Sequence, residues 1–120
     1  MLDNLYAIVR SCAQELANSK GDNTVVLDVR EMIDWTDYFI ITTATSSVHL
    51  KGLLRTSEEI AAAHGVHSAR KPSLDEANEW YLIDYGNFVV HIMSATAREF
   101  YDIEALWYKA KTEKVEPAAV

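Results

Sequence analysis

Four residues near the middle of the chain, Thr43-Ala-Thr-Ser46, have side chains and a setting suited to phosphate. They stand where an apolar run ends and a helical pattern begins, and the start of a helix offers free N–H groups to an anion. A phosphate-transferring enzyme would also need paired carboxylates on the following strand to hold Mg²⁺. The next strand-like segment, 66–71, carries no acid. We therefore interpret the turn as a helix cap and keep an enzyme acting on a nucleotide as the alternative.

The histidines do not form a recognisable metal-binding pattern. His64 and His67 are three residues apart, but no cysteine and no acidic pair stands near them to complete a zinc site. His91 alternates with apolar residues in a strand-like run. It is either a structural histidine bonded to a carboxylate or a contact to a partner. The sequence predicts no bound metal and no cofactor.

A mixed aromatic and acidic set lies in the C-terminal third of the chain. Aromatic side chains beside charged ones are typical of protein interfaces. Trp80 can be interpreted as a core residue or as an exposed anchor, and the charged members as a solvated face. The candidate contacts to a protein partner are Trp80, Asp84, Tyr85, His91, Arg98, Tyr101, Glu104 and Tyr108.

The elements that would position these residues follow from hydrophobic periodicity and turn signals. Asp3 is a plausible first cap, Gly65 a helix stop, and Gly86-Asn87 a hairpin turn. Thr96 and Glu99 have the spacing of a capping box. We expect helices over 3–18, 46–64 and 96–111, and strands over 24–29, 38–43, 66–71, 80–84 and 88–93. The buried stripe of the last helix would be Phe100, Ile103, Leu106, Trp107 and Ala110.

This order of elements, α-β-β-α-β-β-β-α, predicts one α/β domain. Its core would be a mixed sheet of about five strands flanked by helices. We place the domain at residues 1–114 and expect a disordered tail over 115–120. A chain of 120 residues is long enough for one hydrophobic core.

Charge and cysteine content narrow the classes of function. The net charge of −7 argues against binding along a nucleic-acid backbone. It is compatible with a basic protein partner, although plain solubility is the more common reason for such a charge. The single cysteine, Cys12, falls on the apolar stripe of the first helix, which predicts an inert core thiol. We expect a cytoplasmic protein, because one cysteine forms no internal disulfide and no apolar run approaches the roughly 20 residues of a membrane span.

Taken together and in order, several short segments resemble the ribosomal silencing factor family, also called RsfS or the Iojap-like proteins. No single segment is specific to the family, but the ordered set is. Two positions depart from the usual family pattern: Ala44 stands where the family has glycine, and Met93 where it has phenylalanine. The matching segments are Val26-Leu-Asp-Val29, Asp37-Tyr-Phe-Ile-Ile41, Thr43-Ala-Thr-Ser46, Trp80, Asp84-Tyr-Gly86, Val90-His-Ile92, Arg98-Glu-Phe-Tyr101 and Leu106-Trp107.

The resemblance implies a fold like that of nucleotidyltransferases, but without catalysis. It also implies a partner on the large ribosomal subunit, the protein numbered fourteen in the L series, bound on the face that meets the small subunit. Occupation of that face would block subunit joining and repress translation. Family members often form homodimers, so the resemblance implies a homodimer for the free protein.

Overall fold

The first helix, α1, packs along one face of a central sheet. The computed structural model describes the backbone of residues 2–118 and the side chains from Asn4 onward. The side chain of Asp3, the expected cap, and residues 119–120 of the expected tail lie outside the described part. Helix α1 spans Leu2–Asn18, and its apolar stripe buries Val9, Cys12 and Leu16 completely or nearly so. Cys12 is therefore the core thiol that the sequence predicts, and burial raises its pKa to about 12.

Gly21 makes the tight turn from α1 into the sheet possible. Its N–H donates to the carbonyl oxygen of Leu16 at 2.8 Å. A β-carbon at this position would lie 2.7 Å from that same carbonyl oxygen and closer still to the Thr42 hydroxyl. Only glycine therefore allows the helix end to approach the strand this closely.

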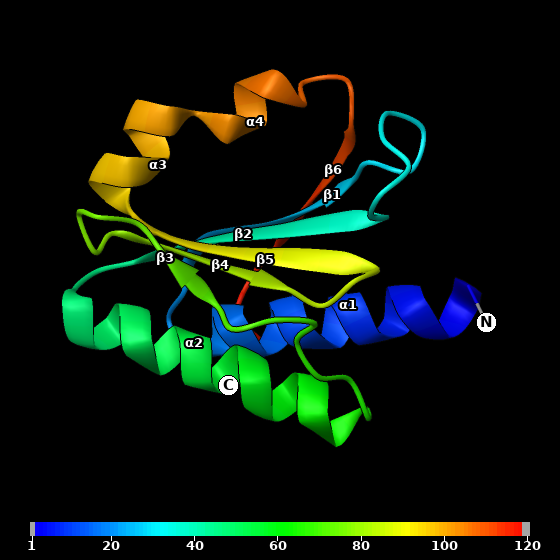
Figure 1. The fold of residues 1–120 in the computed structure, drawn as a ribbon, viewed down its shortest axis with the longest axis horizontal. Coiled ribbons are helices and arrows are strands. Elements are labelled where there is room, and N and C mark those ends of the chain that lie inside the picture. Colours follow the sequence, from blue (N-terminus) through cyan, green and yellow to red (C-terminus); the bar gives the residue numbers. More distant parts are fainter. Residues whose placement is uncertain (1, 119–120) are drawn as a thin grey trace.

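Six strands form one mixed sheet in the order β3-β4-β5-β2-β1-β6 (Figure 1). The strands are β1 (Asp22–Asp28), β2 (Tyr38–Ala44), β3 (Ser73–Leu74), β4 (Trp80–Asp84), β5 (Phe88–Ser94) and β6 (Lys111–Val115). Strands β2 and β5 pair in parallel and every other pair is antiparallel. Every residue of β2 is buried, as expected for a central strand with both faces covered.

Helices cover the two faces of the sheet unequally. Helices α1 and α2 (Ser47–Ala63) lie side by side under one face, while the shorter α3 (Ala95–Tyr101) and α4 (Ile103–Leu106) cross the other (Figure 1). Two separate apolar clusters result, one on each side of the sheet. No described helix is both long and apolar enough to cross a bilayer.

The predicted fold class is confirmed, with one element placed differently in the middle of the chain. Residues of β5 alternate between the two faces of the sheet: Phe88, Val90 and Ile92 join the α1–α2 cluster, while Val89 and Met93 join the other. The prediction of a strand over 66–71 is wrong. That segment is irregular, and the edge strand β3 forms only beyond Pro72.

The prediction of one long last helix over 96–111 is also wrong. Asp102 adopts a left-handed conformation (φ 43°, ψ 51°) and separates α3 from α4, and Ser94 rather than Thr96 caps α3. The break turns Phe100 and Leu106 outward, so that they are 78% and 69% exposed instead of buried.

A sixth strand, β6, takes the place of the end of that helix. It pairs along β1 at the edge of the sheet, and its last residue, Val115, is buried. The expected disordered tail therefore does not begin at Val115. Exposed charged residues such as Lys111 and Lys114 are typical of an edge strand, because they discourage pairing with another chain.

Candidate protein-binding face

A continuous row of ring side chains runs across the sheet face that α3 and α4 cover. Neighbouring rings contact one another with centroids 4.9 to 5.9 Å apart, in tilted or edge-on arrangements that aromatic pairs favour. Trp107 contacts the row at Phe39, with the two ring centroids 5.5 Å apart. We call this set the aromatic row: Trp35, Phe39, His91, Trp80, Tyr101 and Phe100, in spatial order.

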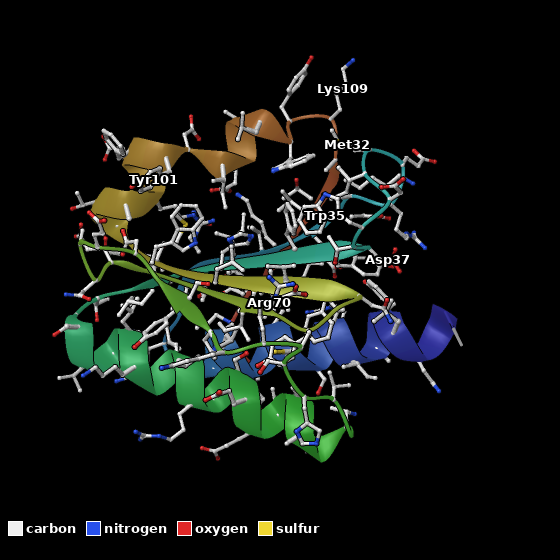
Figure 2. All side chains as sticks on the ribbon, in the orientation of Figure 1. Met32, Trp35, Asp37, Arg70, Tyr101 and Lys109 are labelled. Atoms are coloured by element: carbon white, nitrogen blue, oxygen red, sulfur yellow. The ribbon has the colours of Figure 1, made fainter. Side chains whose placement is uncertain are left out.

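The middle of the aromatic row is buried and its ends are exposed. Phe39 and His91 are almost fully buried, whereas Trp35 is 61% exposed. Figure 2 shows Met32 and Trp35 on the β1–β2 loop, Tyr101 on α3 and Lys109 on the connection from α4 to β6, all on the side of the sheet opposite α1 and α2. Large apolar side chains gathered in this way mark an interaction surface on a protein.

Arg98 connects this face to the sheet through buried hydrogen bonds. Its Nε and Nη2 donate to the two carboxylate oxygens of Glu104 at 2.9 and 3.1 Å. Its Nη1 donates to the carbonyl oxygen of Asn23 at 2.7 Å and to the Thr43 hydroxyl at 2.9 Å. Arg98 thus joins α3, α4, β1 and β2. Its prediction as a surface contact is corrected, because the side chain is buried and fully engaged inside the domain.

His91 is a structural residue beneath Trp80. The indole N–H of Trp80 donates to His91 Nδ1 at 3.2 Å, and the imidazole meets Phe39 edge-on. Burial lowers the pKa of His91 to about 4, so the ring is neutral at physiological pH. Its prediction as a partner contact is corrected, because the ring is only 6% exposed.

Tyr85 lies on the other side of the sheet, among the side chains that face α1 and α2. Its hydroxyl hydrogen-bonds that of Ser57 at 2.9 Å, its ring stacks on Phe88, and burial raises its pKa to about 12. Its predicted role as an exposed anchor is corrected, because the hairpin turns it inward. Asp84 accepts the N–H of Gly86 at 2.8 Å, so it holds the hairpin turn.

The structure therefore brings five of the predicted contact residues to this face. Trp80, His91 and Tyr101 belong to the aromatic row, and Arg98 pairs with Glu104. Tyr108 is exposed just beyond α4. Sequence reasoning missed Trp35 and assigned Phe100 and Leu106 to the core. The signal that could have identified Trp35 is a tryptophan close to Met32 in a polar loop, because large apolar residues in loops usually either pack or bind a partner.

The turn that could bind phosphate acts as a helix cap. The Ser46 hydroxyl accepts the N–H of His49 at 3.0 Å, and the His49 ring bridges Thr45 and the carbonyl oxygen of Ser19. A cavity of about 660 Å³ lies beside this turn, with Asp22 and Glu79 among its lining residues. Within residues 2–118, no group of three or more histidine, cysteine, aspartate or glutamate side chains is arranged to hold a metal ion.

Fold and site together define a single α/β domain that presents a partly exposed aromatic face, as binding proteins do. The model of one family, described as ribosomal silencing factor during starvation (RsfS), matches residues 3–119. The chain belongs to this family.

Several relatives agree with this assignment. The ribosomal silencing factor RsfS of Treponema pallidum is 34% identical over 98 residues, which cover 79% of this chain and 85% of that protein. The mouse protein named mitochondrial assembly of ribosomal large subunit protein 1 is 30% identical over 77% of this chain and 41% of its own length. A crystal structure of a Chromobacterium violaceum protein matches with a TM-score of 0.80 and 30% identity, over 95% of this chain and 94% of that one.

Proposed function

We propose that this protein represses translation by binding the large ribosomal subunit and blocking its union with the small subunit. The proposed partner is the basic protein numbered fourteen in the L series. The observation that carries the proposal is the exposed aromatic face over α3, α4 and the β1–β2 loop. Family membership supports a ribosomal role, and the name of the mouse relative ties that protein to the large subunit.

The ends of the aromatic row supply the apolar contacts of the proposed interface. Trp35 and Phe100 stand exposed, and burying side chains of this size contributes most of the affinity in protein interfaces. A standard interface covers about 800 Å² on each partner, which one face of this domain can provide.

Carboxylates flank the aromatic row on both sides. Glu31 and Asp34 are exposed on the β1–β2 loop, and Glu99 and Asp102 are exposed around α3. Together with the net charge of −7, they would attract a basic protein and speed its encounter. Glu104 remains partly exposed and can add to this acidic rim while it holds Arg98.

We propose further that the mechanism is steric and involves no catalysis. The rival is an enzyme acting on a nucleotide at the cavity beside Ser46. Turnover of a nucleotide by the purified protein would support the rival. Inhibition of subunit joining without any turnover would support steric blocking.

Two charge-introducing variants test the proposed interface. Phe100→Asp places a charge at an exposed end of the aromatic row, and Val48→Asp places the same charge on α2, on the opposite face, where the side chain is 80% exposed. We expect Phe100→Asp to weaken binding of the purified ribosomal protein at least about tenfold, a loss near 1.4 kcal/mol, and Val48→Asp to leave it unchanged. Equal binding by both variants would remove this face from the interface.

We also propose that the free protein is a homodimer, as the family resemblance implies. An exposed apolar face of this kind favours self-association when no partner covers it. Sedimentation equilibrium over a range of protein concentrations measures the state directly. A monomer at every concentration would refute this part of the proposal.

A further inference from the structure

The loop between β1 and β2 holds Trp35 in a fixed position on the binding face. Backbone hydrogen bonds constrain the loop on both sides of the indole. The carbonyl oxygen of Val29 accepts the N–H of Ile33 at 3.1 Å, and the N–H of Asp37 donates to the carbonyl oxygen of Asn87 in the hairpin turn at 3.0 Å. A side chain on a loop held in this way loses little freedom when a partner binds, which favours affinity.

The indole of Trp35 is exposed and has no cation over it within the described part of the chain. Its ring makes one tilted contact, with Phe39, at a centroid distance of 5.9 Å. The ring of Tyr108 is also exposed, but Lys109 already lies over it, with Nζ 5.8 Å from the centroid. Phe100 is exposed as well, yet tryptophan attracts cations more strongly than phenylalanine does. Trp35 is therefore the exposed ring of this face best suited to receive a cation.

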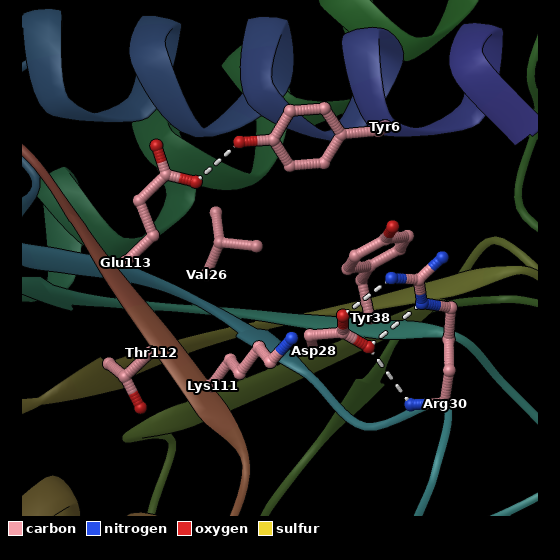
Figure 3. Close-up of a pocket in the computed structure, with 8 residues that line it drawn as sticks. All are labelled: Tyr6, Val26, Asp28, Arg30, Tyr38, Lys111, Thr112 and Glu113. Atoms are coloured by element: carbon pink, nitrogen blue, oxygen red, sulfur yellow. Dashed lines mark hydrogen bonds and ion pairs between the residues drawn. The ribbon is translucent and has the colours of Figure 1, made fainter.

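The same loop carries a surplus of negative charge. Its own cation, Arg30, is engaged away from Trp35, since it donates to both carboxylate oxygens of Asp28, from Nε at 2.9 Å and from Nη2 at 2.7 Å (Figure 3). Three other carboxylates lie within four residues of Trp35 and form no ion pair within 4.0 Å among residues 2–118. They are Glu31, Asp34 and Asp37.

We propose that Trp35 binds a lysine or arginine side chain of the basic partner. This inference rests on the proposed function and identifies the chemistry of one contact within it. The cationic group would lie over the indole, where the negative face of the ring and the nearby carboxylates both attract it. The apolar stem of the same side chain would cover the ring and exclude water from it.

This contact would also select the partner. An acidic side chain over the indole would be repelled by the three carboxylates of the loop. An apolar side chain would bury the ring but leave those carboxylates without a counter-ion. Trp35 therefore distinguishes a cationic surface from other surfaces of similar shape.

Calorimetric titration of the full chain with the purified ribosomal protein tests this inference. Trp35→Leu keeps an apolar side chain but removes the ring, and Trp35→Phe keeps a ring of weaker attraction for cations. Tyr108→Leu is the matched control, because it removes an exposed ring of the same face that a lysine already covers. Asp34→Asn removes one carboxylate beside the indole, and Glu59→Gln removes an exposed carboxylate on α2. Circular dichroism first establishes that each variant is folded.

We expect Trp35→Leu to weaken binding about twentyfold and Trp35→Phe about threefold. Asp34→Asn should weaken it about threefold, whereas Tyr108→Leu and Glu59→Gln should leave it within about twofold. Equal losses in Trp35→Phe and Trp35→Leu would overturn the inference, because the kind of ring would then be irrelevant.

The variant Phe100→Asp separates this inference from the proposed function. If Phe100→Asp weakens binding and Trp35→Leu binds like the unchanged chain, the face remains the interface and the role of Trp35 is refuted. If the unchanged chain does not bind the ribosomal protein, the proposed function and this inference are refuted together.

Discussion

Replacing Arg98 by methionine tests whether this residue holds the binding face onto the sheet. Methionine keeps most of the apolar length of the side chain but removes the guanidinium. The change leaves the Asn23 carbonyl oxygen and the Thr43 hydroxyl without their donor, and Glu104 without its counter-ion. It therefore isolates the hydrogen bonds from the packing.

The expected magnitude follows from the burial of these groups. Breaking a buried ion pair costs roughly 3 to 5 kcal/mol. Glu104 is 35% exposed, so water recovers part of that loss for the carboxylate. We therefore expect the free energy of unfolding to fall by about 3 kcal/mol, which would lower the Tm by about 10 °C.

Urea unfolding followed by tryptophan fluorescence measures this loss, because Trp80 and Trp107 belong to the same face. The matched control is Glu104→Gln, which keeps an acceptor for Arg98 and should cost about 1 kcal/mol. A loss below about 1 kcal/mol for Arg98→Met would refute the anchoring role.

Three further predictions concern stability and binding rate. The pKa of His91 is about 4 in the folded protein and near 6.5 in the unfolded chain, so the unfolded chain binds more protons below pH 6.5. The free energy of unfolding should therefore fall by roughly 3 kcal/mol between pH 6.5 and pH 4. Urea unfolding at each pH measures this loss, which should be smaller in a His91→Gln variant. Gly21→Ala should cost about 2 kcal/mol by urea unfolding, because its methyl group meets the Leu16 carbonyl oxygen, whereas Gly52→Ala in α2 should stabilise by up to about 1 kcal/mol. Added salt should slow association with the ribosomal protein more than it speeds dissociation in surface-binding kinetics; a flat response would discount the acidic rim.

Local signals in the sequence predicted most of the fold. Strand propensity and the Gly86-Asn87 turn placed the two hairpin strands correctly, and Ser46 and Gly65 mark the start and end of α2 as expected. These features depend on a few neighbouring residues, so the sequence contains what is needed to find them.

The C-terminal part was mispredicted because tertiary contacts decide it. Asp102 interrupts a pattern that is helical by period, and its left-handed conformation is not encoded by a glycine. Strand β6 carries exposed charges and has one buried partner strand, so it lacks the apolar signature of a strand. Its pairing with β1 joins segments about 90 residues apart, beyond the reach of local patterns.

The candidate site was only half predictable for the same reason. Composition and clustering identified Trp80 and Tyr101, which contact each other, and Glu104, which pairs with Arg98. Which aromatic side chains are exposed depends on how α3 and α4 break and cross the sheet. Tyr85 was expected to contact a partner but is buried, because the hairpin turns it inward. Phe100 was expected in the core but is exposed, because the break at Asp102 turns it outward.

Subunit joining in the presence of the purified protein is the most direct test of steric blocking. Separated large and small ribosomal subunits are mixed after the large subunits have been saturated with the protein, and joined ribosomes are measured by sucrose-gradient sedimentation. We predict that the protein sediments with large subunits and that few ribosomes form, while the Phe100→Asp variant permits joining. Normal joining by large subunits that carry the unchanged protein would contradict steric blocking.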